Sequence, residues 1–305
     1  MASTLAATLA CVVAATCWAL NAVIAAETFE RGVSPERLAE SRVIVALVPL
    51  AAYLVAARRD LLVPPRAAWP AIAAFGVCIV VVNFAYYLAI ERVPVGVAIA
   101  LQYTAPVIIL VVGALLARRS PHPAAWVAGT LTLAGAALVG GVLGGPSQTF
   151  DSVGLLAGVL AALTYAGYLV SAEVAGRHGT HPVTTLFAGF TVAAVLWAIV
   201  LPLWDWPVEL LRDPDIAWRI LAVGLLGTLL PFGLTVAALR VLSSSVAGIA
   251  TTTEPVLAAA LAWLLLGQVL EPAQILGGGL VVAGVLIAQL IRPPSPASAA
   301  VDAAP

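Results

Sequence analysis

Long apolar stretches separated by short polar clusters run along almost the whole chain. Each stretch holds about 20 residues, the length that a helix needs to cross the hydrocarbon of a bilayer. The stretches contain Gly and Pro but no alternation with period 2, so they predict helices rather than barrel strands. The pattern therefore predicts an all-α membrane protein with ten transmembrane helices, at residues 5–26, 36–57, 68–90, 94–117, 123–143, 152–173, 181–201, 216–239, 244–266 and 273–291.

The second half of the chain repeats the first at an offset of about 149 residues, which pairs Pro106 with Pro255 and Gly135 with Gly284. Five helices per half is an odd number, so the second half must enter the membrane in the opposite orientation. Inverted repeats are a recurring plan of secondary transporters, whose substrate site lies near the bilayer midplane between the repeats. We therefore expect an inverted 5+5 structural repeat around a central cavity, with halves 1–145 and 146–292.

Composition and charge agree with a membrane location. Hydrophobic residues make up 62% of the chain and charged residues 10%, and the mean hydropathy is +1.08, whereas a soluble domain is roughly a quarter charged. All 14 basic residues are Arg. With a cytoplasmic N-terminus, the pairs at 58–59 and 118–119 fall in inner loops, as the positive-inside rule requires. We expect both termini in the cytoplasm and a disordered tail at 293–305, which is rich in Pro, Ser and Ala.

One acidic residue, Glu254, lies about ten residues into the ninth stretch. An acid at the centre of a membrane helix costs roughly 2.5–3.5 kcal/mol. It could bind a substrate amine or carry a coupling proton. Alternatively, it is neutral and bonds the backbone groups that the break at Pro255 leaves free. The sequence leaves both interpretations open.

Prolines interrupt the fourth and ninth stretches at equivalent positions, Pro106 and Pro255. Each removes a backbone donor, so the pair could act as hinges or expose carbonyls to a substrate, or could be ordinary kinks. Gln102 and Tyr103 precede the first proline, and Thr252 lies in the Thr run before the second. These side chains could orient a small polar solute; the alternative is hydrogen bonding between helices, worth on average about 0.6 kcal/mol.

Further polar and aromatic residues recur at helical spacing. Trp18 and Asn21 share a face of the first stretch, Asn83 and Tyr86 share a face of the third, and Tyr165 lies in the sixth. They predict an aromatic-lined, partly polar cavity, although aromatic packing or an interfacial belt would leave the same pattern.

Other features argue against alternative chemistry. Glu40 and Arg42 favour a local ion pair or snorkelling near the start of the second helix. No Arg is expected at mid-membrane, which disfavours phosphorylated solutes. The glycines at 140–145 lack the Lys-Ser/Thr of a phosphate loop, and His178 and His181 have no third ligand nearby. We predict no catalytic residue, no cofactor and no metal.

Several motifs resemble the EamA family of the drug/metabolite transporter superfamily. The sequence WALN at 18–21 resembles the first-helix pattern Trp-Gly-x-Asn, and Arg42 matches the Arg that opens the second helix. The sequence VAIALQYTAP at 97–106 is close to the fourth helix of bacterial threonine/homoserine-type exporters, and TEPV at 253–256 resembles the ninth-helix signature. The resemblance covers about residues 5–291. It departs at 118–119 (Arg-Arg) and 267–268 (Gly-Gln), where the family often has Glu after Leu-Gly.

The resemblance implies ten helices in an inverted 5+5 EamA repeat and export of amino acids or related metabolites across the bacterial inner membrane. Our hypothesis is a secondary transporter that works by alternating access on a small-molecule substrate, within the lipid bilayer, as monomer or homodimer and without nucleic acid. Carriers of drug-like, nucleobase or phosphorylated solutes remain alternatives, and a channel or intramembrane enzyme is disfavoured. Pro106 and Pro255 would be hinges, and the predicted substrate-binding residues are Trp18, Asn21, Asn83, Tyr86, Gln102, Tyr103, Tyr165, Thr252 and Glu254.

Overall fold

A computed structural model describes residues 2–93, 95–118, 121–139, 141, 151–266 and 271–288, and every regular element in these ranges is helical. The predicted tail at 293–305 and the boundary at 145–146 lie outside the described residues. Short 3-10 turns cover Arg59–Leu61, Arg66–Ala68, Leu203–Asp205 and Val208–Arg212. The longer helices are α1 (Ala2–Glu30), α2 (Pro35–Ala57), α3 (Trp69–Arg92), α4 (Val95–Gln102), α5 (Ala105–Ala117), α6 (Pro123–Val139), α7 (Ser152–Arg177), α8 (Pro182–Val200), α9 (Pro214–Gly224), the π-helix η5 (Leu225–Leu229), α10 (Leu230–Ala238), α11 (Ser244–Thr251), α12 (Glu254–Leu266) and α13 (Pro272–Ala288).

Much of the helical surface is apolar. Seven segments are long and apolar enough to cross a membrane, and α6 and α13 are shorter apolar helices. Large apolar side chains such as Leu116 and Ile199 are exposed, at 82% and 72% of their area, as expected where lipid is the solvent. The all-α prediction is confirmed, while the number of ten crossings stays a prediction. The seven segments are Ser3–Glu30, Pro35–Ala57, Arg66–Arg92, Val97–Leu116, Ser152–Arg177, Pro182–Val200 and Pro214–Ala238.

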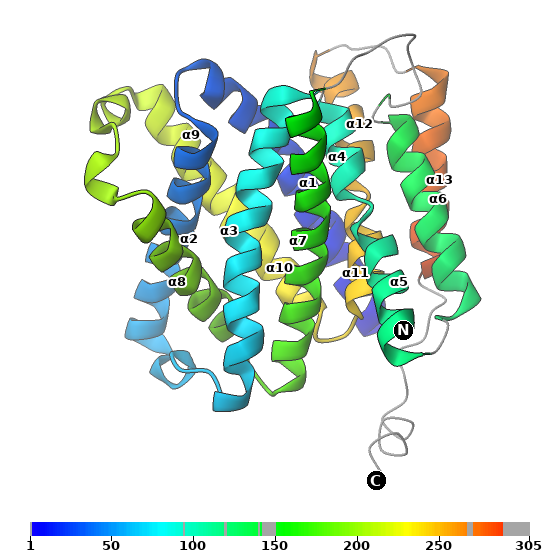
Figure 1. Ribbon diagram of the computed structural model, residues 1–305, viewed down its shortest axis with the longest axis horizontal. Helices are drawn as coiled ribbons and strands as arrows, with labels where there is room; N and C mark the ends of the chain where they lie inside the picture. The colour runs from blue at the N-terminus through cyan, green and yellow to red at the C-terminus, as the bar shows by residue number, and fades with distance from the viewer. Residues whose placement is uncertain are drawn as a thin grey trace.

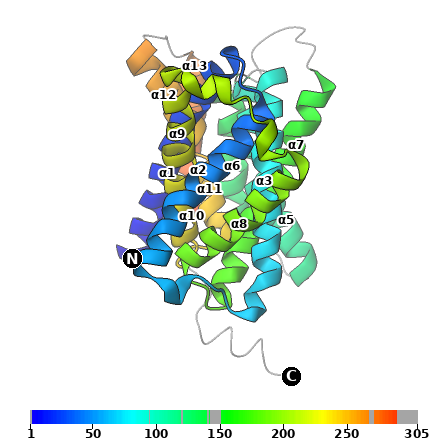
Figure 2. The same cartoon turned by 90° about the vertical axis from the view of Figure 1, so that its left-hand side faces the viewer.

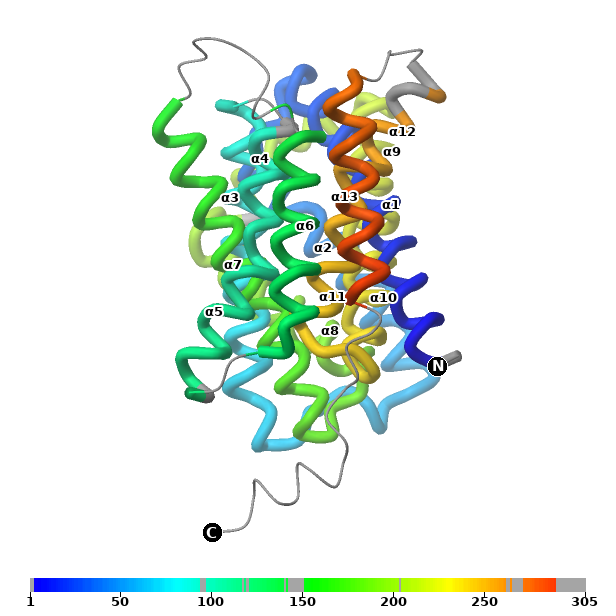
Figure 3. The backbone as a smooth tube through the Cα atoms, turned by 90° about the vertical axis from the view of Figure 1, so that its right-hand side faces the viewer, coloured from blue at the N-terminus to red at the C-terminus, as the bar shows by residue number. Residues whose placement is uncertain are grey.

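The helices are arranged around α3 and α7, which stand side by side in the middle of the molecule (Figure 1). Helices α2, α8 and α9 occupy one flank, which faces the viewer in Figure 2. Helices α6 and α13 form the opposite flank and face the viewer in Figure 3. Helix α1 packs against α10, α11 and α12. The N-cap of α7 is Asp151, and the backbone N–H groups of Val153 and Gly154 lower the pKa of its carboxyl group.

The fourth predicted stretch is broken, as its proline suggests. Helix α4 ends at Gln102 and α5 begins at Ala105, with Pro106 in the first turn of the second piece. The N–H of Thr104 donates to the carbonyl of Leu101 at 3.1 Å, a bond to the third rather than the fourth preceding residue. The turn tightens there because the proline has no donor with which to continue the helix.

The ninth stretch is broken in the same way. Helix α11 ends at Thr251 and α12 begins at Glu254, with Pro255 in its first turn. The N–H of Thr253 donates to the carbonyl of Ala250 at 3.4 Å, again a bond to the third preceding residue. Both interruptions therefore have one cause, and each places two non-helical residues inside an apolar stretch.

The helix bounds carry the repeat found in the sequence. Helix α11 begins and ends 149 residues after α4 (244 − 95 = 149 and 251 − 102 = 149). The same offset relates α5 to α12 (105–117 and 254–266) and α6 to α13 (123–139 and 272–288). Three consecutive helices of one half thus recur with the same length and spacing in the other.

Helices α6 and α13 pack through glycine in a reciprocal way. A Cβ atom at Gly135 would lie 2.5 Å from the carbonyl oxygen of Gly277 and 2.8 Å from the side chain of Val281. A Cβ atom at Gly284, the repeat equivalent of Gly135, would lie 2.8 Å from the carbonyl oxygen of Ala128. The contacts run in opposite directions along the two helices, so the helices are antiparallel, and small residues permit this close approach.

Replacing Gly277 with Ala is expected to destabilise the protein, because the new Cβ would lie 2.7 Å from the carbonyl oxygen of Gly135. Overpacking of this kind costs about 1–3 kcal/mol. Gly279→Ala is the matched control, since it lies in the same helix and its Cβ would have nothing within 4 Å. Thermal unfolding in detergent should give a lower Tm for Gly277→Ala than for Gly279→Ala; equal values would show that the helices are not in contact at Gly277.

Candidate functional site

A small cavity of about 30 Å³ lies where helices from both halves meet. A buried water needs roughly 10–15 Å³ of such volume, so the cavity has room for about two waters. The lining comes from α1, α2, α3, α4, α7, α10 and α12, and seven of the nine residues predicted to bind substrate contribute to it. The lining residues are Trp18, Asn21, Arg42, Val82, Asn83, Tyr86, Gln102, Tyr165, Phe232 and Glu254.

Glu254 connects the two broken helices. It is the first residue of α12 and is 2% exposed, and its carboxyl group accepts a hydrogen bond from the hydroxyl of Tyr103. Tyr103 lies in the break between α4 and α5 and is also buried, although it does not line the cavity. A position at a helix N-terminus favours negative charge. Tyr103 therefore holds the carboxyl group from behind, while the carboxyl group itself faces the cavity.

In the Thr run before Pro255, the predicted residue is Thr252, but the structure connects Thr251 to the cavity instead. The hydroxyl of Tyr165 donates to Oγ1 of Thr251 at 2.8 Å. Thr252 is fully buried, its hydroxyl donates to the carbonyl of Gly248 at 2.9 Å, and it is not among the lining residues. Thr251, which sequence reasoning did not single out, therefore positions a cavity side chain, whereas Thr252 satisfies a backbone group of its own helix.

Aromatic rings form one wall of the cavity. The rings of Trp18 and Phe232 lie 5.4 Å apart edge to face, and Trp18 lies 6.2 Å from Tyr165. Behind this wall, the ring of Tyr165 packs against those of Tyr103 at 5.7 Å and Tyr168 at 5.1 Å. Edge-to-face pairs at these distances are favourable beyond the area they bury. The wall is therefore a rigid surface built from α1, α7 and α10.

Arg42 is the polar lining residue that sequence reasoning missed, beside the apolar Val82 and Phe232. It does not pair with Glu40, which instead bonds Arg37 at 2.9 Å. The guanidinium of Arg42 turns inward and donates to the hydroxyls of Thr228 at 2.7 Å and Tyr87 at 2.9 Å. The sequence neighbour Glu40 suggested a local ion pair. The packing of α2 on the π-helix instead brings Arg42 to acceptors in that segment.

The π-helix η5 supplies two of the acceptors for Arg42. The guanidinium also donates to the carbonyl oxygen of Gly227 at 2.5 Å. The hydroxyl of Thr228 in turn donates to the carbonyl of Val223, five residues earlier, at 2.8 Å. A single π-turn offsets the hydrogen-bonding register and occurs often at functional sites. Gly is required at 227 because a Cβ there would lie 2.2 Å from Oδ1 of Asn21.

Three polar side chains of the cavity keep an atom without a hydrogen-bond partner. They are Oδ1 of Asn21, Oε1 of Gln102 and the hydroxyl of Tyr86, and each residue is less than 9% exposed. Asn83, by contrast, donates its amide to the carbonyl of Ile79 at 2.8 Å. Buried polar groups normally find a partner, so three open ones in residues around a single cavity indicate a place for water or for a polar ligand.

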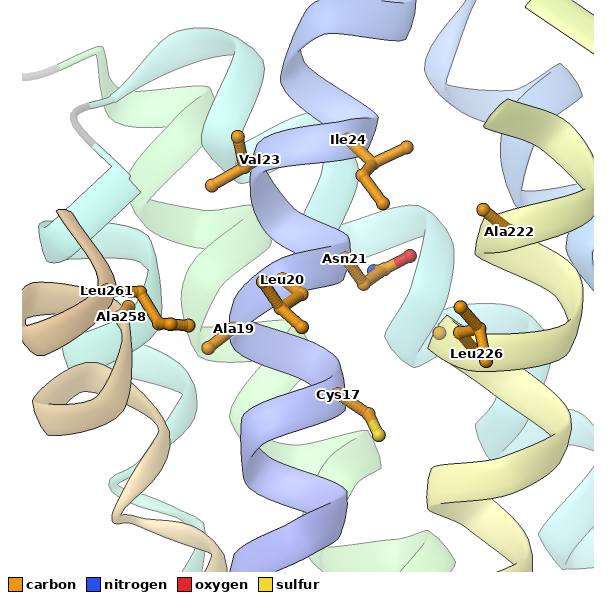
Figure 4. A pocket seen from close by; sticks show the side chains of 11 residues that line it. Cys17, Ala19, Leu20, Asn21, Val23, Ile24, Ala222, Leu226, Ala258 and Leu261 are labelled. Carbon is orange, nitrogen blue, oxygen red and sulfur yellow. The ribbon is translucent and has the colours of Figure 1, made fainter. Parts of the chain in front are cut away.

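A larger groove of about 360 Å³ lies beside the cavity, between α1, α12 and the segment from α9 to η5. Figure 4 shows Ala258 and Leu261 on one side of α1, and Ala222 and Leu226 on the other. Asn21 is its one polar side chain apart from a thiol and points toward the helix of Ala222 and Leu226 (Figure 4). The groove is otherwise apolar and offers little to orient a polar solute.

Charged side chains tie α1, α2 and α9 together at one end of the bundle. Arg219 of α9 pairs with Glu27 of α1 and with Asp215 at 3.2 Å. Arg37 of α2 donates to the carbonyls of Pro202 at 3.4 Å and of Asp205 at 3.2 Å. These polar contacts hold the ends of the helices together at this end of the bundle. Within the described ranges no group of three or more His, Cys, Asp or Glu residues is placed to hold a metal ion.

Comparison with known proteins finds a matching family model, similar curated transporters and a solved structure with a similar fold. The model of the EamA-like transporter family matches residues 5–141 and 152–290. The threonine/homoserine exporter RhtA of Escherichia coli K12 is 31% identical over 215 residues, which cover 68% of this chain and 67% of RhtA. The uncharacterized transporter YwfM of Bacillus subtilis is 26% identical over 222 residues, covering 72% of this chain and 73% of YwfM. One crystal structure shares the fold, with a TM-score of 0.72 and 22% identity over 93% of this chain and 96% of its own.

Removing the hydroxyl of Tyr103 is expected to destabilise the protein through Glu254. In Tyr103→Phe the ring remains but the buried carboxyl group loses its donor, which costs about 1–3 kcal/mol. Tyr103→Phe combined with Glu254→Gln should cost less than the sum of the two single variants, with a coupling of about 0.5–3 kcal/mol. Thermal or denaturant unfolding of the four proteins in detergent measures this coupling free energy. Glu30→Gln, at the exposed end of α1, serves as the uncoupled partner; additive losses for Tyr103 and Glu254 would mean that the bond does not form.

Proposed function

Because this chain belongs to the EamA-like transporter family, we propose that it is a secondary transporter that exports small metabolites, amino acids above all, by alternating access. It is a multi-pass membrane protein, and we place it in the bacterial inner membrane with both termini in the cytoplasm. The observation that carries the proposal is the cavity between the two broken helices, which is lined by a buried acidic residue and by three residues that each keep a polar atom without a partner.

The proposal includes ten helices in an inverted 5+5 repeat, with halves 1–145 and 146–292. The common offset of 149 residues between α4–α6 and α11–α13 supports it. The reciprocal contacts of Gly135 and Gly284 support it too, because a two-fold axis between antiparallel repeats produces such pairs. In this arrangement the cavity lies at the interface of the halves, near the bilayer midplane.

Amino acids are the proposed substrates because of the chemistry of the lining and of the relatives. Glu254 would bind the substrate ammonium group, and Asn21, Asn83, Tyr86 and Gln102 would orient its polar atoms. Trp18 and Tyr165 would form the wall against its side chain, while Tyr103 and Thr252 would support the site from behind. The name of RhtA, an exporter of threonine and homoserine, favours small polar amino acids among the candidates.

Alternating access would open and close this cavity. With a volume of about 30 Å³ it is smaller than any amino acid, so binding requires the surrounding helices to move apart. The breaks at Pro106 and Pro255 border the cavity, and we propose them as the hinges that allow this movement. On one side the movement would separate Arg219 from Glu27.

The function is tested by counterflow of labelled amino acids into proteoliposomes. The purified protein should give saturable exchange with small polar amino acids such as threonine, and aromatic or doubly charged amino acids should compete less well. Empty liposomes and liposomes with heat-inactivated protein provide the background. Well-folded protein that exchanges no member of the panel would contradict amino-acid transport, and single-channel currents would contradict alternating access.

Glu254→Gln is expected to weaken exchange while leaving the protein folded. A charge-assisted hydrogen bond contributes roughly 1.5–3 kcal/mol, so the apparent KM should rise by about 10- to 100-fold. The matched control is Glu30→Gln, which removes an exposed carboxyl group at the end of α1 and should leave the KM unchanged. An unchanged KM for Glu254→Gln at wild-type Tm would exclude Glu254 from substrate binding.

A further inference from the structure

We propose that Arg42 binds the carboxylate of the substrate, so that the cavity selects solutes carrying both a carboxylate and an amine. This inference rests on the proposed function and makes it more specific. It assigns to Arg42 a role in substrate recognition and gives the cavity two chemically different ends, a guanidinium from α2 and a carboxyl group from α12.

Arg42 is a buried cation that forms no salt bridge with a described acid, and Glu254 interacts with it only over a longer distance. The residue is 2% exposed, and no carboxylate oxygen of the described residues lies within 4.0 Å of it. Its acceptors in the protein are the neutral oxygens of Thr228, Tyr87 and Gly227. A buried charge without a counter-ion is unfavourable, and a bound anion would relieve this cost.

The guanidinium is held in place but is not saturated. A guanidinium has five N–H donors, and the bonds to Thr228, Tyr87 and Gly227 use three of them, which leaves two. Its carbon lies 5.3 Å from the centre of the Tyr87 ring, a favourable position for a cation. Two donors on a fixed, planar group that lines a cavity are what a carboxylate requires for a two-point hydrogen bond.

The second charged group of the cavity determines which anion fits. Glu254 lines the same cavity, and it bonds Tyr103 rather than Arg42. A zwitterion would compensate both groups at once, with its carboxylate at Arg42 and its ammonium group at Glu254. A phosphate group, with up to two negative charges, would meet a single guanidinium and an opposing acid. The pair therefore favours amino acids over phosphorylated solutes or simple amines.

The test on the wild-type protein is competition in the counterflow assay with labelled threonine. Unlabelled threonine is compared with threonine amide, which lacks the carboxylate, and with the amine formed by removing the carboxyl group. Both analogues should compete about 10- to 100-fold more weakly than threonine, the range expected for loss of a charge-assisted hydrogen bond. Equal competition by the amide would overturn the inference, as would stronger competition by glycerol phosphate.

Variants connect this selectivity to Arg42. In Arg42→Gln the ratio between the amide and threonine should fall to about one, because threonine loses its advantage. Thr228→Val, which removes one hydrogen bond from the guanidinium, should reduce the ratio partially. Arg58→Gln, which changes an exposed Arg outside the membrane helices, should keep the wild-type ratio. A wild-type ratio in Arg42→Gln would overturn the assignment; if that variant does not fold, Thr228→Val and the wild-type competition still decide it.

The outcomes separate this inference from the proposed function. If the wild-type protein exchanges no amino acid, both are wrong. If it exchanges threonine but accepts the amide equally well, amino-acid transport stands and carboxylate binding by Arg42 is excluded. Weak competition by the amide together with a collapsed ratio in Arg42→Gln supports both.

Discussion

The structure depends on one constraint: polar groups inside hydrocarbon must find partners within the protein, because lipid offers none. The prolines of the fourth and ninth stretches free backbone groups at two places along apolar helices, and both places lie in the interior. The hydrogen bond from Tyr103 to Glu254 spans them, so a side chain in one break gives a buried carboxyl group beside the other break its partner. Other polar side chains, such as Gln102 and Tyr86, line the same cavity as Glu254. At Asn21, Gln102 and Tyr86, which all line the cavity, one side-chain atom remains without a partner.

The same constraint explains why small residues matter in the frame that carries the cavity. Between apolar helices in lipid the hydrophobic effect gives little attraction, so close packing and hydrogen bonds must supply it. Gly135 and Gly284 bring α6 and α13 into backbone contact, and Gly227 lets η5 approach Asn21 of α1. The π-turn at η5 then presents a carbonyl and a hydroxyl to Arg42. Glycine thus determines where helices approach each other, and the approach determines where polar atoms can be satisfied.

Sequence reasoning predicted the helices and most of the cavity, because both follow from periodicity. Apolar stretches of membrane length predict spans, and the spacing of three residues placed Trp18 with Asn21 and Asn83 with Tyr86, all of which line the cavity. It failed where the answer depends on contacts between distant segments. Arg42 was interpreted through its sequence neighbour Glu40, whereas two of its partners lie about 185 residues away in η5 and the third, Tyr87, lies in α3. Thr252 was chosen over Thr251 because the pattern cannot tell which hydroxyl of a Thr run leaves its own helix.

Helices of one half have equivalents in the other, but the charged residues of the cavity do not. This difference matters for what the cavity can recognise. Helices α4–α6 and α11–α13 are equivalent, yet the counterpart of Glu254 is Ala105 (254 − 149 = 105), an apolar residue. Helix α8, which follows the first helix of the second half as α2 follows α1, has no charged residue to match Arg42. A site built from identical residues of both halves would carry the same charge at each end. Because each charged group occurs in only one copy, the cavity is lined by one cationic and one acidic side chain, and in the proposed function an asymmetric solute would bind it in one orientation.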